Sequence, residues 1–139
     1  MRAAPTLSRA VLLRWLQRKS REAGGQESFD YLQTTQQLGL LLHDKGDLAA
    51  AEPLLRDTAE GMTALRGDDD ESALTSRAAY ASLLLAKGDL AAAEPRLKEV
   101  CHTARLALGE GHVATQHCER QHIDCLGRLG IADAAAYVC

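Results

Sequence analysis

The 139-residue sequence predicts an all-α fold, namely a short right-handed α-solenoid of helix-turn-helix units with about six helices. The first observation is an internal repeat, because the nine letters KGDLAAAEP stand at residues 45–53 and again, unchanged, at residues 87–95. The second is the composition, in which 46% hydrophobic residues come mainly from alanine and leucine and only 4% of residues are aromatic. The third is the lack of any alternating strand pattern. Together these features indicate stacked helical pairs.

Each copy of KGD separates two apolar segments, so one unit contains two helices. In the segment before each KGD, apolar residues recur at helical spacing. They are Leu32, Leu38, Leu41 and Leu42 in the first unit, and Leu74, Tyr80, Leu83 and Leu84 in the second.

The KGD letters themselves predict a tight turn. Gly46 and Gly88 end the first helices, since glycine readily takes the left-handed conformation that a helix C-terminus commonly needs. Asp47 and Asp89 then begin the second helices as N-caps, because an aspartate side chain accepts hydrogen bonds from the free backbone N–H groups.

The same offset of 42 positions finds degenerate copies at both ends of the chain. Residues 10–25 align with residues 52–67, and residues 125–139 align with residues 83–97. The expected organisation is a basic N-terminal helix, half repeat or cap at residues 1–27, a first repeat at 28–68, a second at 69–110 and a degenerate, truncated third at 111–139.

A further pattern carries a resemblance to a known family. A pattern of Leu108, Gly109, His112 and Thr115 leads into a first helix, and an alanine- and leucine-rich first helix leads on to the GDLAAAEPLLR motif. This arrangement resembles the 42-residue tetratricopeptide repeat of kinesin light chains and nephrocystin-3-type proteins, over about three quarters of the chain.

Small residues stand where the resemblance implies close helix packing. Gly39 and Ala81 take the positions where the two helices of one unit approach. Ala51, Ala93 and Ala135 take the positions where successive units meet.

The resemblance implies a non-catalytic adaptor or scaffold that binds a peptide or helix of a protein partner in a concave groove, without a cofactor. The groove would be lined by the first helices. The residues expected there are Gln33, Gln36, Gln37, Leu40, His43, Thr75, Ala78, Ser82, His117, Arg120, Gln121 and Asp124. A plain solvated helix face would carry the same polar residues, so this alternative stands beside the groove.

Kinesin light chains carry a pair of asparagines at three matching places in their repeats. This sequence has Gln36 and Gln37 at the first place, and the alanines at 78 and 79 at the second. Residues 120 and 121 of the third are arginine and glutamine. The groove of this chain is therefore expected to differ from the one that the kinesin proteins use for cargo.

A second functional hypothesis is a small structural subunit of a larger multiprotein assembly. The truncated third unit ends in ADAAAYVC, an alanine-rich half repeat. Apolar surface at the end of a solenoid tends to recruit another chain or another copy of the same chain. Self-association through the repeat ends is part of this hypothesis.

The N-terminus contains six basic residues before the first acid, Glu22. Such a segment is typical of an organelle transit peptide or of a membrane-surface helix. The same segment also aligns with the second helix of a repeat. In that case it would be a capping helix, with Trp15 and Leu16 covering the open end of the stack. The sequence thus predicts a cytoplasmic protein, with organelle import as the alternative.

A cluster of cysteine and histidine gives a hypothesis from a third class, a metal- or redox-responsive module. Cys118, His122 and Cys125 share one helix face, and Cys101 or His112 would be a fourth ligand for a soft metal such as zinc. The repeat offset places two of the three positions in the packing stripe, where cysteine acts as a small apolar residue. Packing is therefore the preferred interpretation, with no metal expected.

The charge, the hydropathy and the motifs of the sequence argue against several other classes of function. The net charge is −3 with both signs interspersed, so no basic field for nucleic acid is expected. No apolar run has the roughly 18 residues that a membrane span needs, which makes a membrane partner unexpected. Neither a glycine-rich phosphate loop nor a spaced nucleophile, base and acid is recognisable, and the chain is expected not to be an enzyme.

Overall fold

The computed structural model describes residues 9–24 and 28–130, and every regular element in this part of the chain is an α-helix. The prediction of an all-α solenoid with six helices is confirmed. The helices are α1 (Arg9–Gly24), α2 (Phe29–Asp44), α3 (Leu48–Arg66), α4 (Glu71–Ala86), α5 (Leu90–Leu108) and α6 (Val113–Arg128).

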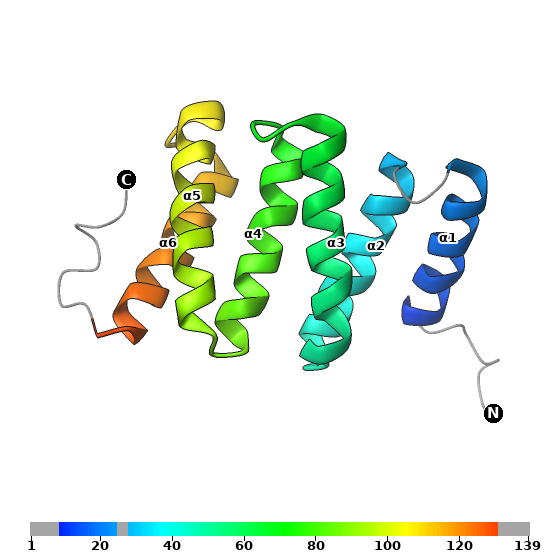
Figure 1. Ribbon diagram of the computed structural model, residues 1–139, viewed down its shortest axis with the longest axis horizontal. Helices are drawn as coiled ribbons and strands as arrows, with labels where there is room; N and C mark the ends of the chain where they lie inside the picture. Colours follow the sequence, from blue (N-terminus) through cyan, green and yellow to red (C-terminus); the bar gives the residue numbers. More distant parts are fainter. Residues whose placement is uncertain (1–8, 25–27, 131–139) are drawn as a thin grey trace, which may run out of the picture.

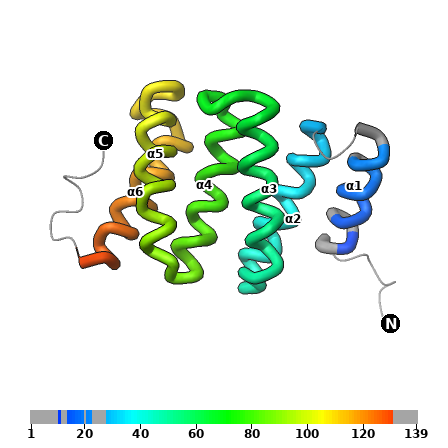
Figure 2. Tube along the Cα trace, in the orientation of Figure 1, coloured from blue at the N-terminus to red at the C-terminus, as the bar shows by residue number. Residues whose placement is uncertain are grey.

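The helices form one row in chain order, with α1 and α6 at opposite ends (Figure 1). Each helix packs on the next one, and the chain trace advances steadily along the row (Figure 2). In addition, α2 contacts α4, and α4 contacts α6. By contrast, no Cα atom of α3 comes within 8 Å of a Cα atom of α5. Because α2, α4 and α6 lie closer together than the helices behind them, the row curves toward these three helices.

The helix-ending turns repeat with the period of the sequence. Gly46, Gly88 and Gly130 have φ angles of 86°, 83° and 85°, in the left-handed region that favours glycine. The prediction for Gly46 and Gly88 is confirmed, and Gly130 ends α6 in the same way.

The predicted N-caps are also present. The Oδ1 atom of Asp47 accepts a hydrogen bond from the backbone N–H of Ala50 at 3.2 Å. Asp89 accepts the equivalent bond from Ala92 at 3.3 Å. Each cap satisfies a backbone donor that the first turn of a helix leaves open.

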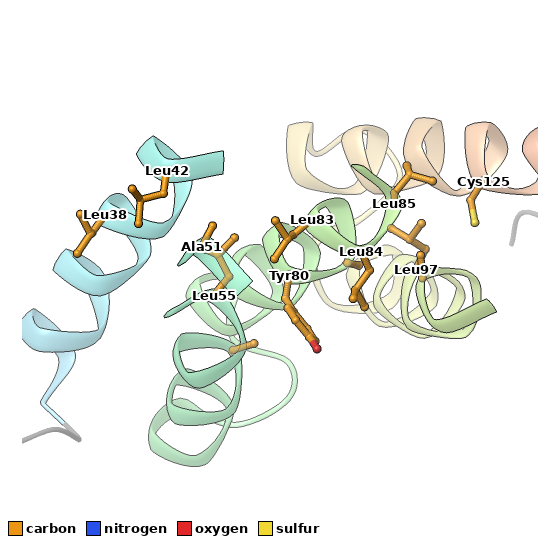
Figure 3. Packing of buried hydrophobic residues seen from close by; sticks show 13 residues of the cluster. Leu38, Leu42, Ala51, Leu55, Tyr80, Leu83, Leu84, Leu85, Leu97 and Cys125 are labelled. Carbon is orange, nitrogen blue, oxygen red and sulfur yellow. The ribbon is translucent and has the colours of Figure 1, made fainter. Parts of the chain in front are cut away.

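The largest core cluster is made mostly of leucine and alanine side chains that fill the space between successive helices (Figure 3). Ala51 and Ala93 are fully buried, as expected for positions between units, whereas Ala135 lies outside the described residues. A Cβ atom placed on Gly39 would lie 2.7 Å from Cδ2 of Leu55. A methyl group at this position would therefore force the buried Leu55 side chain to shift.

Helix α1 continues the stack beyond α2. The amide nitrogen of Gln17 donates a hydrogen bond to Oγ1 of Thr35 at 2.8 Å. Trp15 and Leu16 remain 47% and 37% exposed, and the Lys19 ammonium lies 5.9 Å from the Trp15 ring centre. The end of the row is thus only partly covered by these side chains.

No helix in the described ranges is both long enough and apolar enough to cross a membrane. Cytoplasmic location, and import through the basic N-terminal segment, stay predictions. Residues 1–8 and 131–139, which include the expected second half of the third unit, lie outside the described part of the chain.

Candidate functional site

A groove with a volume of about 540 Å³ lies on the side toward which the row of helices curves. Helix α4 lies between α2 and α6, and all three contribute to the walls of the groove. The lining is mostly apolar. It consists of Gln36, Leu40, His43, Asp44, Glu71, Leu74, Thr75, Ala78, Ala79, Ser82, Ala104, His112, Val113, Ala114, His117, Cys118 and Gln121.

Most of the residues expected in a groove lie together here. Eight of them line this groove: Gln36, Leu40, His43, Thr75, Ala78, Ser82, His117 and Gln121. Gln33 and Gln37 instead border a smaller hollow of about 260 Å³, which shares Gln36 with the groove. Arg120 and Asp124 line neither space, and the Asp124 carboxylate lies 3.1 Å from the guanidinium of Arg128.

Two of the predicted amides take part in holding the helices together. The hydroxyl of Ser76 on α4 donates to the side-chain oxygen of Gln36 on α2 at 2.5 Å. On the other side of the groove, the hydroxyl of Ser82 donates to the side-chain oxygen of Gln121 on α6. These bonds fix α2 and α6 relative to α4, so they help to set the width of the groove.

The charged and titratable groups of the groove lie at two places: Glu71 and His112 stand where α4 and α6 begin, whereas His43 and Asp44 stand near the opposite end, where α2 ends (Figure 1). His112 is the N-cap of α6, and its Nδ1 atom accepts a bond from the N–H of Ala114 at 3.1 Å. Its Nε2 atom lies 3.4 Å from a carboxylate oxygen of Glu71. With His43 and Asp44 also in the lining, polar groups border a mainly apolar surface. Such a surface is suited to binding, because apolar area supplies affinity and a few polar groups give orientation.

Sequence reasoning missed a part of this wall. None of the residues expected in the groove lies between positions 109 and 113, yet His112, the N-cap of α6, and Val113, its first residue, line the groove. Val113 is 75% exposed, and the repeat offset aligns it with Glu71. A valine at a position that is charged in the preceding repeat is the signal that would have identified it.

The cysteine and histidine cluster of α6 does not form a metal site. No group of three His, Cys, Asp or Glu side chains in the described residues is placed to hold a metal ion. The Nε2 atom of His122 lies 3.1 Å from a carboxylate oxygen of Glu94. The thiol of Cys125 donates to the carbonyl oxygen of Leu90 at 3.8 Å. The metal alternative is therefore not supported, and all three predicted ligands are buried in the packing.

Two of the thiols differ in their acidity. A hydrogen bond with the side chain of Cys101 lowers the pKa of Cys118 below the ordinary thiol value. Burial raises the pKa of Cys125, and the nearby carboxylates of Glu94 and Asp124 add to this increase.

Comparison with solved structures finds the same architecture elsewhere. The crystal structure of BtubC (BKLC) from P. vanneervenii resembles this chain with a TM-score of 0.81 and 16% sequence identity. The match covers 91% of this chain and 51% of the other, so the chain spans about half the length of that protein. At this identity the likeness establishes the fold alone.

Sequence comparisons supply the family. No curated protein sequence matches the chain. The family model described as tetratricopeptide repeat matches residues 31–105, which is more than half of the sequence. The matched range contains both copies of the nine-letter motif, most of α2, all of α3 and α4, and most of α5. The chain therefore belongs to the tetratricopeptide repeat family.

Proposed function

We propose that this chain is a non-catalytic protein–protein interaction module that binds a peptide or helix of a partner in the groove between α2, α4 and α6. Tetratricopeptide repeats generally mediate protein–protein interactions. The observation that carries the proposal is the mostly apolar groove of about 540 Å³ on the concave side of the repeats. A space of this size accepts several side chains of a bound segment.

The residues that line the groove on α4 indicate which kind of partner side chain it would bind. Ala78 and Ala79 are the residues of α4 at the place where kinesin light chains carry an asparagine pair, and both line the groove. Methyl groups cannot bond to a peptide backbone, but they leave room for apolar side chains. We therefore propose repeats of the kinesin light chain type whose groove prefers a partner with apolar side chains.

The experiment is a selection of binding peptides from a random display library against the full chain. Two groove variants are compared with the wild type by measuring the Kd of the selected peptides. Leu40→Ser and Val113→Glu each introduce the residue found 42 positions away in the neighbouring repeat, at side chains that are 36% and 75% exposed. Both substitutions are therefore compatible with the fold.

Leu106→Ala is the matched control. Leu106 is 74% exposed on α5, does not line the groove, and aligns with Ala64 of the preceding repeat. We expect each groove variant to weaken binding by about tenfold, which corresponds to about 1.4 kcal/mol, and the control to bind like the wild type. Equal Kd values for all three variants would show that the selected peptides do not bind in the groove.

A second candidate function, a structural subunit of a larger assembly, is favoured by the two ends of the row. Val11 and Trp15 on α1 are 48% and 47% exposed, and Ile123 on α6 is 38% exposed. These apolar side chains lie on the first and last helices, at opposite ends of the stack (Figure 1). Uncovered apolar surface of this kind favours contact with another chain.

The end variants separate this candidate from groove binding. Trp15→Asp and Ile123→Ala copy Asp57 and Ala81, the residues at the matching positions of the next and the preceding repeat. The assembly hypothesis predicts that the mass of the native complex in cell extract, measured after affinity purification, falls for these variants and not for Leu40→Ser. A fall in mass for Leu40→Ser and not for the two end variants would favour binding in the groove.

A further inference from the structure

Two thiols meet at the interface between α5 and α6, close to the groove. Cys101 on α5 is fully buried, and Cys118 on α6 is 2% exposed. Both belong to one apolar cluster with Leu74, Ala78 and Val100. A side-chain hydrogen bond with Cys101 lowers the pKa of Cys118 below the ordinary thiol value. Two consecutive helices thus bring both cysteines into the same packed cluster.

The fold does not need sulfur at this position. The repeat offset aligns Cys101 with Ala59 and Cys118 with Ser76. Ala59 and Ser76 are likewise buried, at the interface between α3 and α4. The chain therefore closes the same helix contact once with two thiols and once with none, so the contact does not require sulfur.

Cys118 is the member of the pair that borders the groove. Its side chain is part of the lining of the groove, whereas Cys101 lies behind it and does not line the groove. The hydrogen bond with Cys101 favours the Cys118 thiolate, and the thiolate is the form that attacks oxidants. Cys125 is different, because burial disfavours its thiolate and its proton is bonded to the carbonyl oxygen of Leu90.

We propose that Cys118 and Cys101 form a redox-sensitive dithiol, which a small peroxide entering through the groove converts into a disulfide that joins α6 to α5. This inference goes beyond partner binding and does not depend on it. It also requires no metal and involves neither His122 nor Cys125.

The chemistry balances with a hydroperoxide as the oxidant. The Cys118 thiolate attacks one oxygen of hydrogen peroxide, the O–O bond breaks, and the second oxygen leaves as hydroxide, which takes up a proton to give water. Cys118 is then a sulfenic acid. The Cys101 sulfur attacks the sulfur of Cys118, the S–O bond breaks, and the oxygen leaves as a second water with the Cys101 proton. Two thiols are oxidised to one disulfide while one peroxide is reduced to two waters.

The disulfide would connect two helices at the groove. Cys118 lines the groove on α6, and Cys101 belongs to α5, so the bond closes the loop formed by residues 101–118. It fixes α6 against α5 at one point. The wall that α6 contributes to the groove is then covalently held.

The experiment uses the full chain with Cys139→Ser, which removes the cysteine outside the described residues. Native protein is treated with a molar excess of hydrogen peroxide, remaining thiols are alkylated, and the protein is digested without reduction. Mass spectrometry then identifies the linked peptides, and circular dichroism before and after treatment verifies that the chain stays helical. We expect a peptide pair joined through Cys101 and Cys118, with Cys125 recovered as the alkylated thiol.

Two variants give matched controls, since they copy the residues of the α3–α4 interface. Cys101→Ala removes the second thiol, so we expect Cys118 to accumulate as a sulfenic acid that dimedone traps. Cys118→Ser removes the attacking thiolate, so we expect Cys101 to stay reduced. The proposal is overturned if the native chain keeps both thiols reduced, if Cys118 is oxidised further without joining Cys101, or if Cys118 joins Cys125.

Discussion

Ser76 donates its hydroxyl proton to the side-chain oxygen of Gln36 at 2.5 Å, and this bond joins the first helices of two successive repeats. Ser76 is 1% exposed, so the bond is shielded from water on the side of α4. Ser82 and Gln121 make the matching connection between α4 and α6. The concave side of the solenoid is therefore held by polar links between α2, α4 and α6 as well as by apolar packing.

The link between Gln36 and Ser76 predicts an energetic coupling. Gln36→Ala and Ser76→Ala are each expected to lower the free energy of unfolding, because each removes one partner of a partly buried hydrogen bond. A double-mutant cycle measured by urea unfolding should give a coupling energy of about 0.5–1.5 kcal/mol. A coupling near zero would show that the bond does not hold α2 to α4.

Gly39 predicts a strong steric effect of a single methyl group. Gly39→Ala adds a Cβ atom 2.7 Å from Cδ2 of Leu55, which is itself 1% exposed and cannot move aside freely. Overpacking of this kind costs about 1–3 kcal/mol, which exceeds the gain of up to about 1 kcal/mol from replacing glycine in a helix. We expect a lower midpoint in urea unfolding.

Gly127→Ala is the control for this prediction. Gly127 is also helical, is exposed, and has no atom within 4 Å of an added Cβ. The same exchange should therefore leave stability unchanged or raise it by up to about 1 kcal/mol. If both alanine variants behave alike, the close approach of α2 and α3 is not what requires Gly39.

The buried ring of His122 predicts the cost of removing its partner. His122 is fully buried, and its Nε2 atom lies 3.1 Å from Glu94. Glu94→Ala leaves that ring nitrogen without this partner, and we expect a loss of about 1–3 kcal/mol in the free energy of unfolding. Glu99→Ala on the same helix should cost at most about 1 kcal/mol, because the side chain of Glu99 is 71% exposed where it pairs with Arg77. Equal losses for the two variants would contradict the interpretation that Glu94 stabilises the fold as the partner of the buried His122 ring.

The two buried thiols of α6 predict different pH dependences of alkylation. The pKa of Cys118 is lowered by its bond with Cys101, and the pKa of Cys125 is raised by burial. Since iodoacetamide reacts with the thiolate, the rate at Cys118 should reach half of its maximum at a lower pH than the rate at Cys125. Site-resolved mass spectrometry across a pH series measures both rates. A lower half-maximal pH at Cys125 than at Cys118 would contradict the directions of the two pKa shifts.

The fold was predictable because its determinants are local and repeated. Gly46 and Asp47 specify one turn between paired helices, and the copy of this turn 42 positions later fixes the period. Gly39 marks a close helix approach within one unit. Such features depend on near neighbours in the sequence, so a reading of the sequence can find them.

The groove was predictable only in part, because it is formed by three helices from different repeats. Its position on the first helices follows from the repeat, but the width depends on hydrogen bonds such as the one between Ser82 and Gln121. The contact of Cys101 with Cys118 joins two helices whose packing angle no local pattern specifies. The same is true of Val113, the first residue of α6, which lines the groove although the residues expected there do not include it.

The most direct test of partner binding in the groove is a map of amide chemical shifts by nuclear magnetic resonance. A peptide selected against the full chain is titrated into the isotope-labelled protein. Binding in the groove predicts the largest shifts at residues of α2, α4 and α6 that line it, such as Leu40, Thr75 and His117. Shifts confined to α3 and α5, or to the exposed ends at Trp15 and Ile123, would contradict it.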